Sequence, residues 1–246
     1  MLAIIGGTGA ASLAGLTVRQ RLIVRTPYGD PSGPLIVGEL AGGSVLFLAR
    51  HGYGHTIPPH RINYRANIWA LASQGAEQIV GLASVGGIGR VFRPGVLVLP
   101  DQLLDYTWGR RQTFFDGDDR VVSHVDFTEP YAASLREPLL EAARVLKVSL
   151  IDGGVYACMQ GPRLETAAEI RRIRRDGGDM VGMTAMPEAV LARELGAAYA
   201  TLAVVANRAA GVAESAGSIN QVDATQALAQ GLAVAAMVFE KYVSIS

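Results

Sequence analysis

Short apolar runs that end at glycine or proline alternate along this chain with longer segments whose apolar residues recur every three to four positions. Most of the short runs lack a polar–apolar alternation, which is typical of strands buried on both faces of a central sheet. Strands that alternate with helices in this way predict an α/β fold built in layers. The predicted strands are Leu2–Ile5, Leu35–Leu40, Val45–Ala49, Ile79–Ala83, Val96–Leu99, Val155–Met159 and Ala200–Val205.

Helices are predicted where apolar side chains share one face at a period near 3.6 residues. Neither an internal repeat nor a change in composition divides the chain, so residues 1–246 are interpreted as one domain. Two stretches rich in proline, glycine or polar residues, Thr26–Pro34 and Arg110–Arg120, are predicted to be loops. The predicted helices are a segment with Ile62, Ala66, Trp69 and Ala70 that ends near Gly75, then Ser134–Leu146, Glu165–Arg175, Pro187–Leu195, and a last helix with Leu228, Leu232, Ala235, Phe239 and Tyr242.

Charge and cysteine content exclude several classes of protein. Twenty-two basic residues balance twenty-two acidic ones, which argues against a nucleic-acid-binding surface. The single cysteine, Cys158, rules out an internal disulfide and favours a reducing compartment. The first residues lack the basic region of a signal peptide, and no uninterrupted apolar run is long enough to span a bilayer. We therefore expect a soluble, cytoplasmic protein.

A glycine-rich turn, Gly6-Gly7-Thr8-Gly9, follows the first predicted strand directly. Glycines at such a turn allow backbone N–H groups to approach an anion, and the Thr8 hydroxyl can add a hydrogen bond. The spacing does not match the dinucleotide-binding fingerprint, because a third glycine is missing after Gly9, which is followed by Ala10 and Ala11, and no phosphate-binding G-x-x-x-x-G-K sequence occurs. A phosphate-binding turn and a tight turn without a ligand both stay open.

Other polar residues follow buried strands in the same manner. Arg50 and His51 come directly after Val45–Ala49, at the kind of sheet edge where open α/β folds bind ligands. The arginine offers a planar fork that matches phosphate oxygens, although a surface ion pair is the alternative. Ser84 and Thr184 lie at two further turns of small residues. Together these turns predict one phosphate pocket at one edge of the sheet.

Five sequence motifs, taken together, resemble the trimeric purine nucleoside phosphorylases, and in particular their methylthioadenosine and methylthioinosine branch. The resemblance runs in uninterrupted order from Ile4 to about Asn207 and is weaker beyond Gly211. It implies a single-domain, three-layer fold in which helices flank a central mixed β-sheet. The motifs are Gly6-Gly-Thr-Gly9, Leu48-Ala-Arg-His-Gly52, Asn63-Tyr-Arg-Ala-Asn-Ile-Trp-Ala-Leu71, Gly161-Pro-Arg-Leu-Glu165 and Gly182-Met-Thr-Ala-Met-Pro-Glu188.

The resemblance also implies roles for individual residues. Met183 would pack against the sugar, and Glu165 and Asn207 would read the base. Leu164 stands where the family usually has a phenylalanine beside the base, which leaves that stacking contact in doubt. His124 resembles a residue that reaches the 5′ pocket of a neighbouring subunit, so a homotrimer is implied. The implied phosphate-binding positions are Thr8, Arg50, His51 and Thr184, with the backbone amide of Ser84.

The most informative departure from the family pattern is at Asn207 and Ala209. The similar methylthioadenosine enzymes carry an aspartate at both positions, and this chain carries neither. A different base is therefore implied, and the expected reaction is phosphorolysis of a 6-oxopurine nucleoside, with S-methyl-5′-thioinosine as the leading candidate. No organic cofactor or metal is expected, because phosphorolysis needs only inorganic phosphate as second substrate and no cluster of His, Cys and carboxylate residues at ligand spacing occurs in the sequence. Arg50, His51 and Asn207 are the expected catalytic residues.

Three alternatives stay open at this point. The chain could be a general inosine or guanosine phosphorylase, a methylthioadenosine phosphorylase, or a nucleotide-binding module without turnover. Formation of base and sugar 1-phosphate only when phosphate is present distinguishes the enzymes from the module. Val212 and Ala213 offer apolar surface for a 5′-methylthio group, and His55 and His60 are left without an assigned role. Trp69 and Cys158 are interpreted as core residues.

Overall fold

The computed structural model describes residues 1–10, 12–117, 121–215 and 217–245. The strands are β1 (Leu2–Gly6), β2 (Thr17–Leu22), β3 (Leu35–Leu40), β4 (Gly43–Ala49), β5 (Gln78–Gly87), β6 (Leu97–Leu99), β7 (Gln102–Asp105), β8 (Leu150–Asp152), β9 (Val155–Cys158), β10 (Met180–Gly182) and β11 (Ala198–Arg208). The α-helices are α1 (Tyr64–Ser73), α2 (Ala133–Leu146), α3 (Ala167–Arg175), α4 (Ala185–Glu194) and α5 (Gln221–Ile245). Short 3₁₀ turns cover Pro59–Arg61 and Ala213–Ser215.

All of these strands join one mixed sheet. One continuous path runs β2-β3-β4-β1-β5-β10-β9-β7, and β11 lies along the other edge of β5, where it also pairs with β6. The central strands β4, β1, β5 and β11 are parallel, whereas β10 runs antiparallel to β5 and β6 antiparallel to β11. The expected mixed sheet is therefore confirmed.

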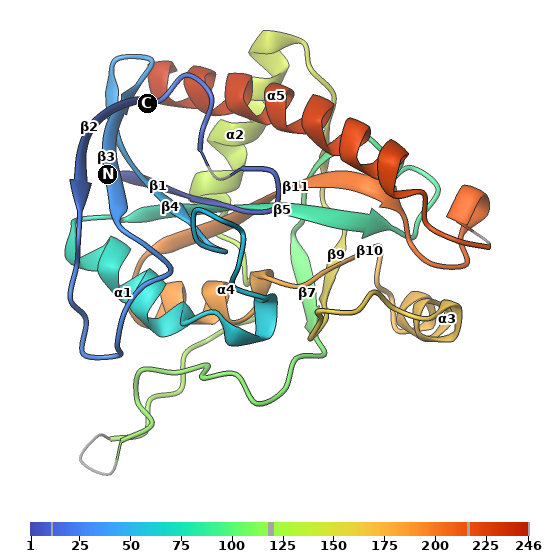
Figure 1. Ribbon diagram of the computed structural model, residues 1–246, viewed down its shortest axis with the longest axis horizontal. Coiled ribbons are helices and arrows are strands. Elements are labelled where there is room, and N and C mark those ends of the chain that lie inside the picture. The colour runs from blue at the N-terminus through green and yellow to red at the C-terminus, as the bar shows by residue number, and fades with distance from the viewer. Residues whose placement is uncertain (11, 118–120, 216, 246) are drawn as a thin grey trace.

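Helices cover both faces of the sheet (Figure 1). α2 and α5 lie on one face, and α1 and α4 cover the other. The residues of β1 alternate between these layers: Leu2 and Ile4 belong to the core under α2 and α5, and Ala3 and Ile5 to the core under α1 and α4. Because both faces of β1 are buried, its sequence is a continuous apolar run. The expected three-layer α/β architecture is confirmed.

Each predicted strand is present, but four further strands were missed. β2 is a polar edge strand with an exposed face, Thr17–Leu22, so it carries no apolar signal. β7, β8 and β10 have only three or four residues each, and they exist because neighbouring strands supply their hydrogen-bond partners. A segment of three or four residues is too short to show a repeating polar–apolar pattern, so the sequence alone does not reveal strands of this kind.

The predicted helices are also present, with shifted boundaries. α1 begins at Tyr64, because the side chain of Asn63 accepts a hydrogen bond from the amide of Ala66. α3 begins at Ala167, because Thr166 and Glu169 form a reciprocal capping box. α4 begins two residues before Pro187, with non-helical backbone at Met186 and Pro187. Local caps, rather than apolar periodicity, decide where these helices start.

The last helix is longer than its apolar stripe suggested. By length and composition alone, Gln221–Ile245 could cross a membrane. Its buried side chains, among them Leu228, Ala235 and Phe239, pack instead into the core shared with the sheet and α2. A core helix of a soluble protein meets the same criterion, and the packing of α5 accounts for its apolar residues in that way.

A long connection between β7 and α2 extends away from the sheet (Figure 1). Its first part, predicted to be a loop, has neither helix nor strand over residues 110–117, yet side chains anchor it to the body of the protein. Glu194 of α4 accepts hydrogen bonds from the Thr113 hydroxyl (2.6 Å) and the Phe114 amide (2.7 Å). Arg65 of α1 forms an ion pair with Asp116 at 2.7 Å. The rest of the predicted loop, residues 118–120, lies outside the described residues.

Candidate active site

The main cavity of the described chain has a volume of about 530 Å³ and opens beside the middle of β5. On one edge of β5, β1 pairs with Gln78–Gly81 and β10 pairs with Gly86 and Gly87. None of the described strands therefore pairs with Leu82–Val85 on that edge of β5. Ala83, Ser84 and Val85 line the cavity, whose volume is typical of small-molecule sites. The site lies where the sheet changes partners, as ligand sites in open α/β sheets do.

Nine of the ten predicted site residues line this one cavity. They come from separate parts of the chain: the turn after β1, the end of β4, the middle of β5, the turn before α3, the segment from β10 to α4, and the end of β11. These nine are Thr8, Arg50, His51, Ser84, Leu164, Glu165, Met183, Thr184 and Asn207. The predicted convergence of the strand ends on one pocket is what the structure shows, while the roles of the individual residues stay predictions.

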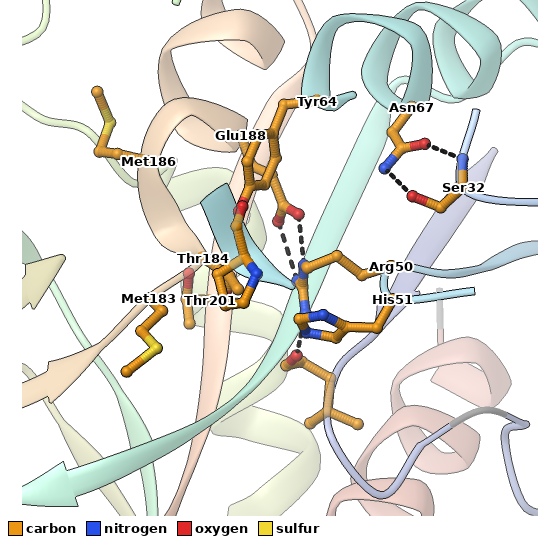
Figure 2. Close-up of polar contacts among 12 residues, drawn as sticks. Ser32, Arg50, His51, Tyr64, Asn67, Met183, Thr184, Met186, Glu188 and Thr201 are labelled. Atoms are coloured by element: carbon orange, nitrogen blue, oxygen red, sulfur yellow. Dashed lines mark hydrogen bonds and ion pairs between the residues drawn. The ribbon is translucent and has the colours of Figure 1, made fainter. Parts of the chain in front are cut away.

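Arg50 forms a buried ion pair that the sequence reading did not foresee (Figure 2). Its Nε donates to Oε1 of Glu188 at 2.5 Å, and its Nη2 donates to Oε2 at 3.0 Å. The Arg50 and Glu188 side chains are 1% and 0% exposed. Burial lowers the pKa of Arg50, but the adjacent Glu188 carboxylate outweighs burial and raises it. The alternative interpretation of Arg50 as a member of a surface ion pair is therefore wrong, because its ion pair with Glu188 is enclosed in the core.

This pair also changes how Arg50 can meet phosphate. The bidentate face of the guanidinium, expected to receive phosphate oxygens, is occupied by Glu188. A third N–H, on Nη1, donates to the carbonyl oxygen of Leu82 at 2.9 Å. An arginine carries five N–H donors, so one on Nη1 and one on Nη2 remain to point at an anion in the cavity. Arg50 can thus still bind phosphate, with two donors rather than the whole fork.

Glycines make room for this guanidinium. A Cβ atom on Gly7 would come within 3.0 Å of Arg50 Nη1, and one on Gly81 would come within 3.1 Å of Nη2 and 2.4 Å of the Tyr199 hydroxyl oxygen. Tyr199 in turn donates to Glu188 Oε2 at 2.8 Å. A side chain at Gly7 would collide with the Leu82 carbonyl oxygen (2.5 Å) and one at Gly81 with the Tyr199 hydroxyl, and both of these groups belong to the hydrogen-bond network of Arg50 and Glu188.

His51 lies beside Arg50 and is held in one orientation (Figure 2). Its Nδ1 is 2.8 Å from the carbonyl oxygen of Ile57, which can only accept a hydrogen bond, so Nδ1 carries the proton. Burial, together with the charge of Arg50, lowers the pKa of His51 to about 4. At neutral pH the ring is uncharged and its Nε2 is a hydrogen-bond acceptor. His51 was expected to add a donor to phosphate; its uncharged form can instead accept from a protonated phosphate oxygen or a sugar hydroxyl.

The predicted base-reading residues, Glu165 and Asn207, line the same cavity. A register shift between Val205 and Asn207, where β11 pairs with β5, places Asn207 at a bulge beside Gly86. The Nδ2 of Asn207 donates to the carbonyl of Arg208 at 2.6 Å, which leaves one amide hydrogen and the Oδ1 atom for a ligand. Burial raises the pKa of the Glu165 carboxyl above its ordinary value. Leu164, 46% exposed, lies at the rim.

A third part of the cavity wall is formed by residues without a predicted role. His55, Thr56, Ile57, Pro58 and Pro59 line it from the loop after β4, and Ile219 lines it from the segment before α5. Four of these six residues, Ile57, Pro58, Pro59 and Ile219, are apolar. Val212 and Ala213, expected to supply apolar surface for a 5′ substituent, do not line the cavity; Val212 packs against the small core that contains Ile170 and Ala209. Val212 and Ala213 are therefore not part of this wall, which includes Ile219 instead.

The remaining candidates lie elsewhere. His124 is exposed on the long connection and is not part of the cavity wall. His60 is exposed, and Trp69 and Cys158 pack in the core as interpreted. Burial raises the pKa of the Cys158 thiol to about 12, so the thiol is inert at neutral pH. No group of three or more metal-ligating side chains occurs within the residues that the structure describes.

Two residues important to the site geometry were missed. Glu188 was included in a motif without a role, although a glutamate within the apolar run Met186-Pro-Glu-Ala-Val-Leu191 is itself a signal of a buried, paired charge. Ile219 lies in the segment where the sequence resemblance weakens. No local pattern marks Ile219 as a wall of the pocket, because its position depends on how α5 docks on the sheet.

Comparison with known proteins agrees with this geometry. The family model described as the phosphorylase superfamily matches residues 1–244. A "Probable S-methyl-5′-thioinosine phosphorylase" of Xanthomonas campestris pv. campestris is 57% identical over 214 residues, covering 87% of this chain and 86% of the relative. The "6-oxopurine nucleoside phosphorylase" of Pyrococcus furiosus is 49% identical over 216 residues, covering 86% of this chain and 80% of the relative.

Solved structures give the same result. Methylthioadenosine phosphorylase from Schistosoma mansoni in complex with adenine superposes with a TM-score of 0.93 at 29% identity, covering 99% of this chain and 91% of that one. A methylthioadenosine phosphorylase from an antarctic soil metagenomic library has a TM-score of 0.90 at 37% identity and covers 99% and 85%. The match extends past Gly211, where the motifs had weakened. The chain therefore belongs to the phosphorylase superfamily.

Proposed function

We propose that this protein catalyses phosphorolysis of S-methyl-5′-thioinosine, giving hypoxanthine and 5-methylthioribose 1-phosphate. The observation that carries the proposal is that one cavity is lined both by the predicted phosphate donors and by Glu165 and Asn207. Relatives about half identical to this chain bear the names of methylthioinosine and 6-oxopurine nucleoside phosphorylases. Inorganic phosphate is the second substrate, and the reaction needs no cofactor.

Phosphorolysis requires a nucleophile on one side of the sugar C1′ and a stabilised leaving base on the other. Phosphate is held by Thr8, Arg50 and Thr184, with the amide of Ser84, and it both attacks C1′ and supports the positive charge that develops on the sugar. The bond that breaks is the one from C1′ to the purine N9, and its electron pair passes to the base. The bond that forms joins a phosphate oxygen to C1′.

Asn207 supports the leaving base through one amide. Its free N–H donates to O6, while Oδ1 accepts a hydrogen bond from the protonated N7 as negative charge builds on the purine. Glu165, when ionised, accepts a hydrogen bond from N1–H. A 6-aminopurine offers a bare N1 lone pair to the same carboxylate, so hypoxanthine fits this pair of residues and adenine does not.

The 5′ end of the nucleoside faces the apolar part of the wall. Once phosphate and base occupy their ends of the cavity, the surface formed by Ile57, Pro58, Pro59 and Ile219 is left for the 5′ substituent. An apolar methylthio group gains from this burial, whereas a 5′-hydroxyl loses hydrogen bonds to water. His55 and Thr56 also line this region and carry groups that could hydrogen-bond to a 5′-hydroxyl, so a general 6-oxopurine phosphorylase is the second candidate.

The proposed enzyme is a cytoplasmic homotrimer. His124 is exposed on a connection that extends away from its own subunit, and Trp108 and Val122 are 71% and 70% exposed in the same connection. A neighbouring subunit that covers these side chains would bring His124 near a second cavity. Light scattering coupled to gel filtration measures the mass, and a monomer at micromolar concentration contradicts this part of the proposal.

The test is a substrate panel with purified protein. Inosine, guanosine, methylthioinosine and methylthioadenosine are each incubated with and without phosphate, and free base and sugar 1-phosphate are quantified. We expect products only with phosphate, and the highest kcat/KM for methylthioinosine. Base release without phosphate indicates a nucleosidase, and no product from any nucleoside indicates a binding module; either result overturns the proposal.

A further inference from the structure

Arg110 has the densest set of hydrogen bonds of any side chain near the cavity, although it is not part of the cavity wall. It lies five residues after β7, at the start of the long connection. Its Nη1 donates to the carbonyl oxygens of Met183 (2.9 Å) and Met186 (2.6 Å) and to the hydroxyl of Tyr64 (3.2 Å). Its Nη2 donates to the carbonyl oxygens of Met159 (3.2 Å) and Gln160 (2.9 Å), and its Nε to Oε1 of Gln160 (3.2 Å).

These acceptors belong to two different segments. Met159 and Gln160 follow β9 and lead directly into Gly161–Glu165, the segment that carries the base-reading Glu165. Met183 and Thr184, the latter proposed to bind phosphate, connect β10 to α4, and Met186 is the second residue of α4. Nη2 thus holds the first segment and Nη1 the second, so one planar group links two neighbouring segments of the cavity wall, which the hydrogen bond from the Met159 amide to the Gly182 carbonyl (2.7 Å) also joins.

We propose that Arg110 is a positioning residue that fixes the spacing between the base-reading wall and the sugar–phosphate wall of the cavity. This inference rests on the proposed function, since it assigns Glu165 to the base and Met183 and Thr184 to sugar and phosphate. Arg110 itself touches neither substrate. It acts through the backbone of the segments that do.

The chemistry of its partners explains why an arginine is needed. All six hydrogen bonds go to uncharged oxygen atoms, and within the described residues no carboxylate lies within ion-pair distance of Arg110. Carbonyl groups on two separate segments need donors at fixed separation and in one plane, which a guanidinium provides. A lysine ammonium is a compact group on a flexible stem and holds one segment at a time.

Arg111 is a matched control. It neighbours Arg110 in sequence and carries the same charge, but its side chain is 72% exposed and its ion pair with Asp116 lies at the surface. Replacing Arg111 by alanine removes the same charge from the same connection without touching either wall. An effect of Arg110 that Arg111 lacks is therefore due to its contacts and not to its charge.

The experiment compares R110A, R110K and R111A with the unmodified protein. For each protein, kcat/KM is measured for methylthioinosine and methylthioadenosine, together with KM for phosphate and the melting temperature. A misplacement on the order of 1 Å costs about a hundredfold in rate, so we expect R110A to lose about a hundredfold in kcat/KM for methylthioinosine. We expect the preference for methylthioinosine to fall about tenfold and KM for phosphate to rise, because both walls move. R111A should stay within about twofold.

A purely structural role would lower the melting temperature and the amount of active protein but leave the substrate ratio and KM for phosphate unchanged. R110K keeps the charge and the stem, so it decides the question if R110A does not fold. A folded R110K or R110A whose substrate ratio and phosphate KM equal those of R111A overturns the inference, and so does full rescue by lysine. If the unmodified protein shows no phosphorolysis, the proposed function has failed; if it is active and the Arg110 variants are unaltered, only this inference has failed.

Discussion

The two ends of the cavity are built differently. At the phosphate end, Arg50, Glu188 and Thr184 are 1%, 0% and 7% exposed, and the Arg50–Glu188 pair is enclosed in the core of the fold. At the base end, Leu164 is 46% exposed, and the base-reading side chains stand on the segment before α3 and at the last residues of β11. Reorganising the phosphate end means disturbing the core, whereas the base end can change by single substitutions. On the proposed assignment, we therefore expect substitutions at the base end to alter substrate choice at a smaller cost in stability than substitutions at the phosphate end.

The largest expected effect is on the buried ion pair. Replacing Arg50 by alanine leaves Glu188 buried without its cation, and breaking such a pair costs about 3–5 kcal/mol of folding free energy. The charge-assisted bond to phosphate, worth about 1.5–3 kcal/mol, is lost as well, so KM for phosphate should rise and turnover fall. Urea unfolding and phosphate titrations measure the two effects.

The control for this variant is Arg19→Ala, which removes an arginine from an exposed pair with Glu39. An exposed pair contributes at most about 1 kcal/mol, so R19A should be close to the unmodified protein in stability. Equal destabilisation by R50A and R19A would contradict the description of a rigid phosphate end. Unchanged phosphate dependence in R50A would remove Arg50 from the phosphate site.

The next effect is base choice, which tests whether the base end can be altered by one residue. We expect at least about a hundredfold preference in kcat/KM for methylthioinosine over methylthioadenosine, because adenine leaves a mismatched contact at Glu165. Asn207→Asp should reduce that preference, since a carboxylate can accept from N6 and from protonated N7 together. The ratio is taken within one preparation, so differences in active concentration cancel. An unmodified protein that prefers methylthioadenosine refutes the roles of Glu165 and Asn207 but not phosphorolysis.

A smaller effect is expected at the 5′ wall. Burial of a methylthio group contributes on the order of 1–2 kcal/mol, so methylthioinosine should be preferred over inosine by roughly ten- to thirtyfold. Ile219→Ala should lower this ratio by about threefold to fivefold, because it removes part of the apolar surface. Val212→Ala is the matched control and should not change the ratio, since Val212 lies outside the cavity. The opposite ranking of these two variants would contradict the wall seen in the structure.

The smallest expected effect is the pH dependence of base choice. Burial raises the pKa of Glu165, with Glu169 also raising it and Arg163 lowering it. Above that pKa the carboxylate accepts from N1–H of a 6-oxopurine; as pH falls through it, the protonated acid can donate to the N1 lone pair of a 6-aminopurine. The preference for methylthioinosine should therefore decrease as the pH is lowered from neutral towards that pKa, and the ratio of the two kcat/KM values measured across the pH range checks this. In Glu165→Gln, which does not titrate, the ratio should be independent of pH; the same slope in both proteins assigns the effect to another group.

Much of the site was predictable because it lies in short, continuous motifs at strand ends. The turn with Thr8, the pair Arg50-His51 and the segment of Met183 and Thr184 each follow a buried apolar run, and parallel strands bring such ends to one edge of a sheet. The layered fold was predictable for the same reason. Apolar periodicity is a local property, and it records which faces of an element are buried.

The local sequence pattern could not predict contacts between segments that are far apart in the chain. The partner of Arg50 is 138 positions away, the partners of Arg110 lie 46 to 76 positions away, and Ile219 reaches the cavity only because α5 docks on the sheet. The sequence by itself determined the strand ends, the small residues in the turns and the chemistry of the base-reading positions. Only the tertiary structure decided that Glu188 occupies the fork of Arg50, that Ile57 fixes the tautomer of His51 and that Arg110 joins the two walls. A hydrogen bond depends on the distance between its atoms, and for residues far apart in the chain that distance is set by packing.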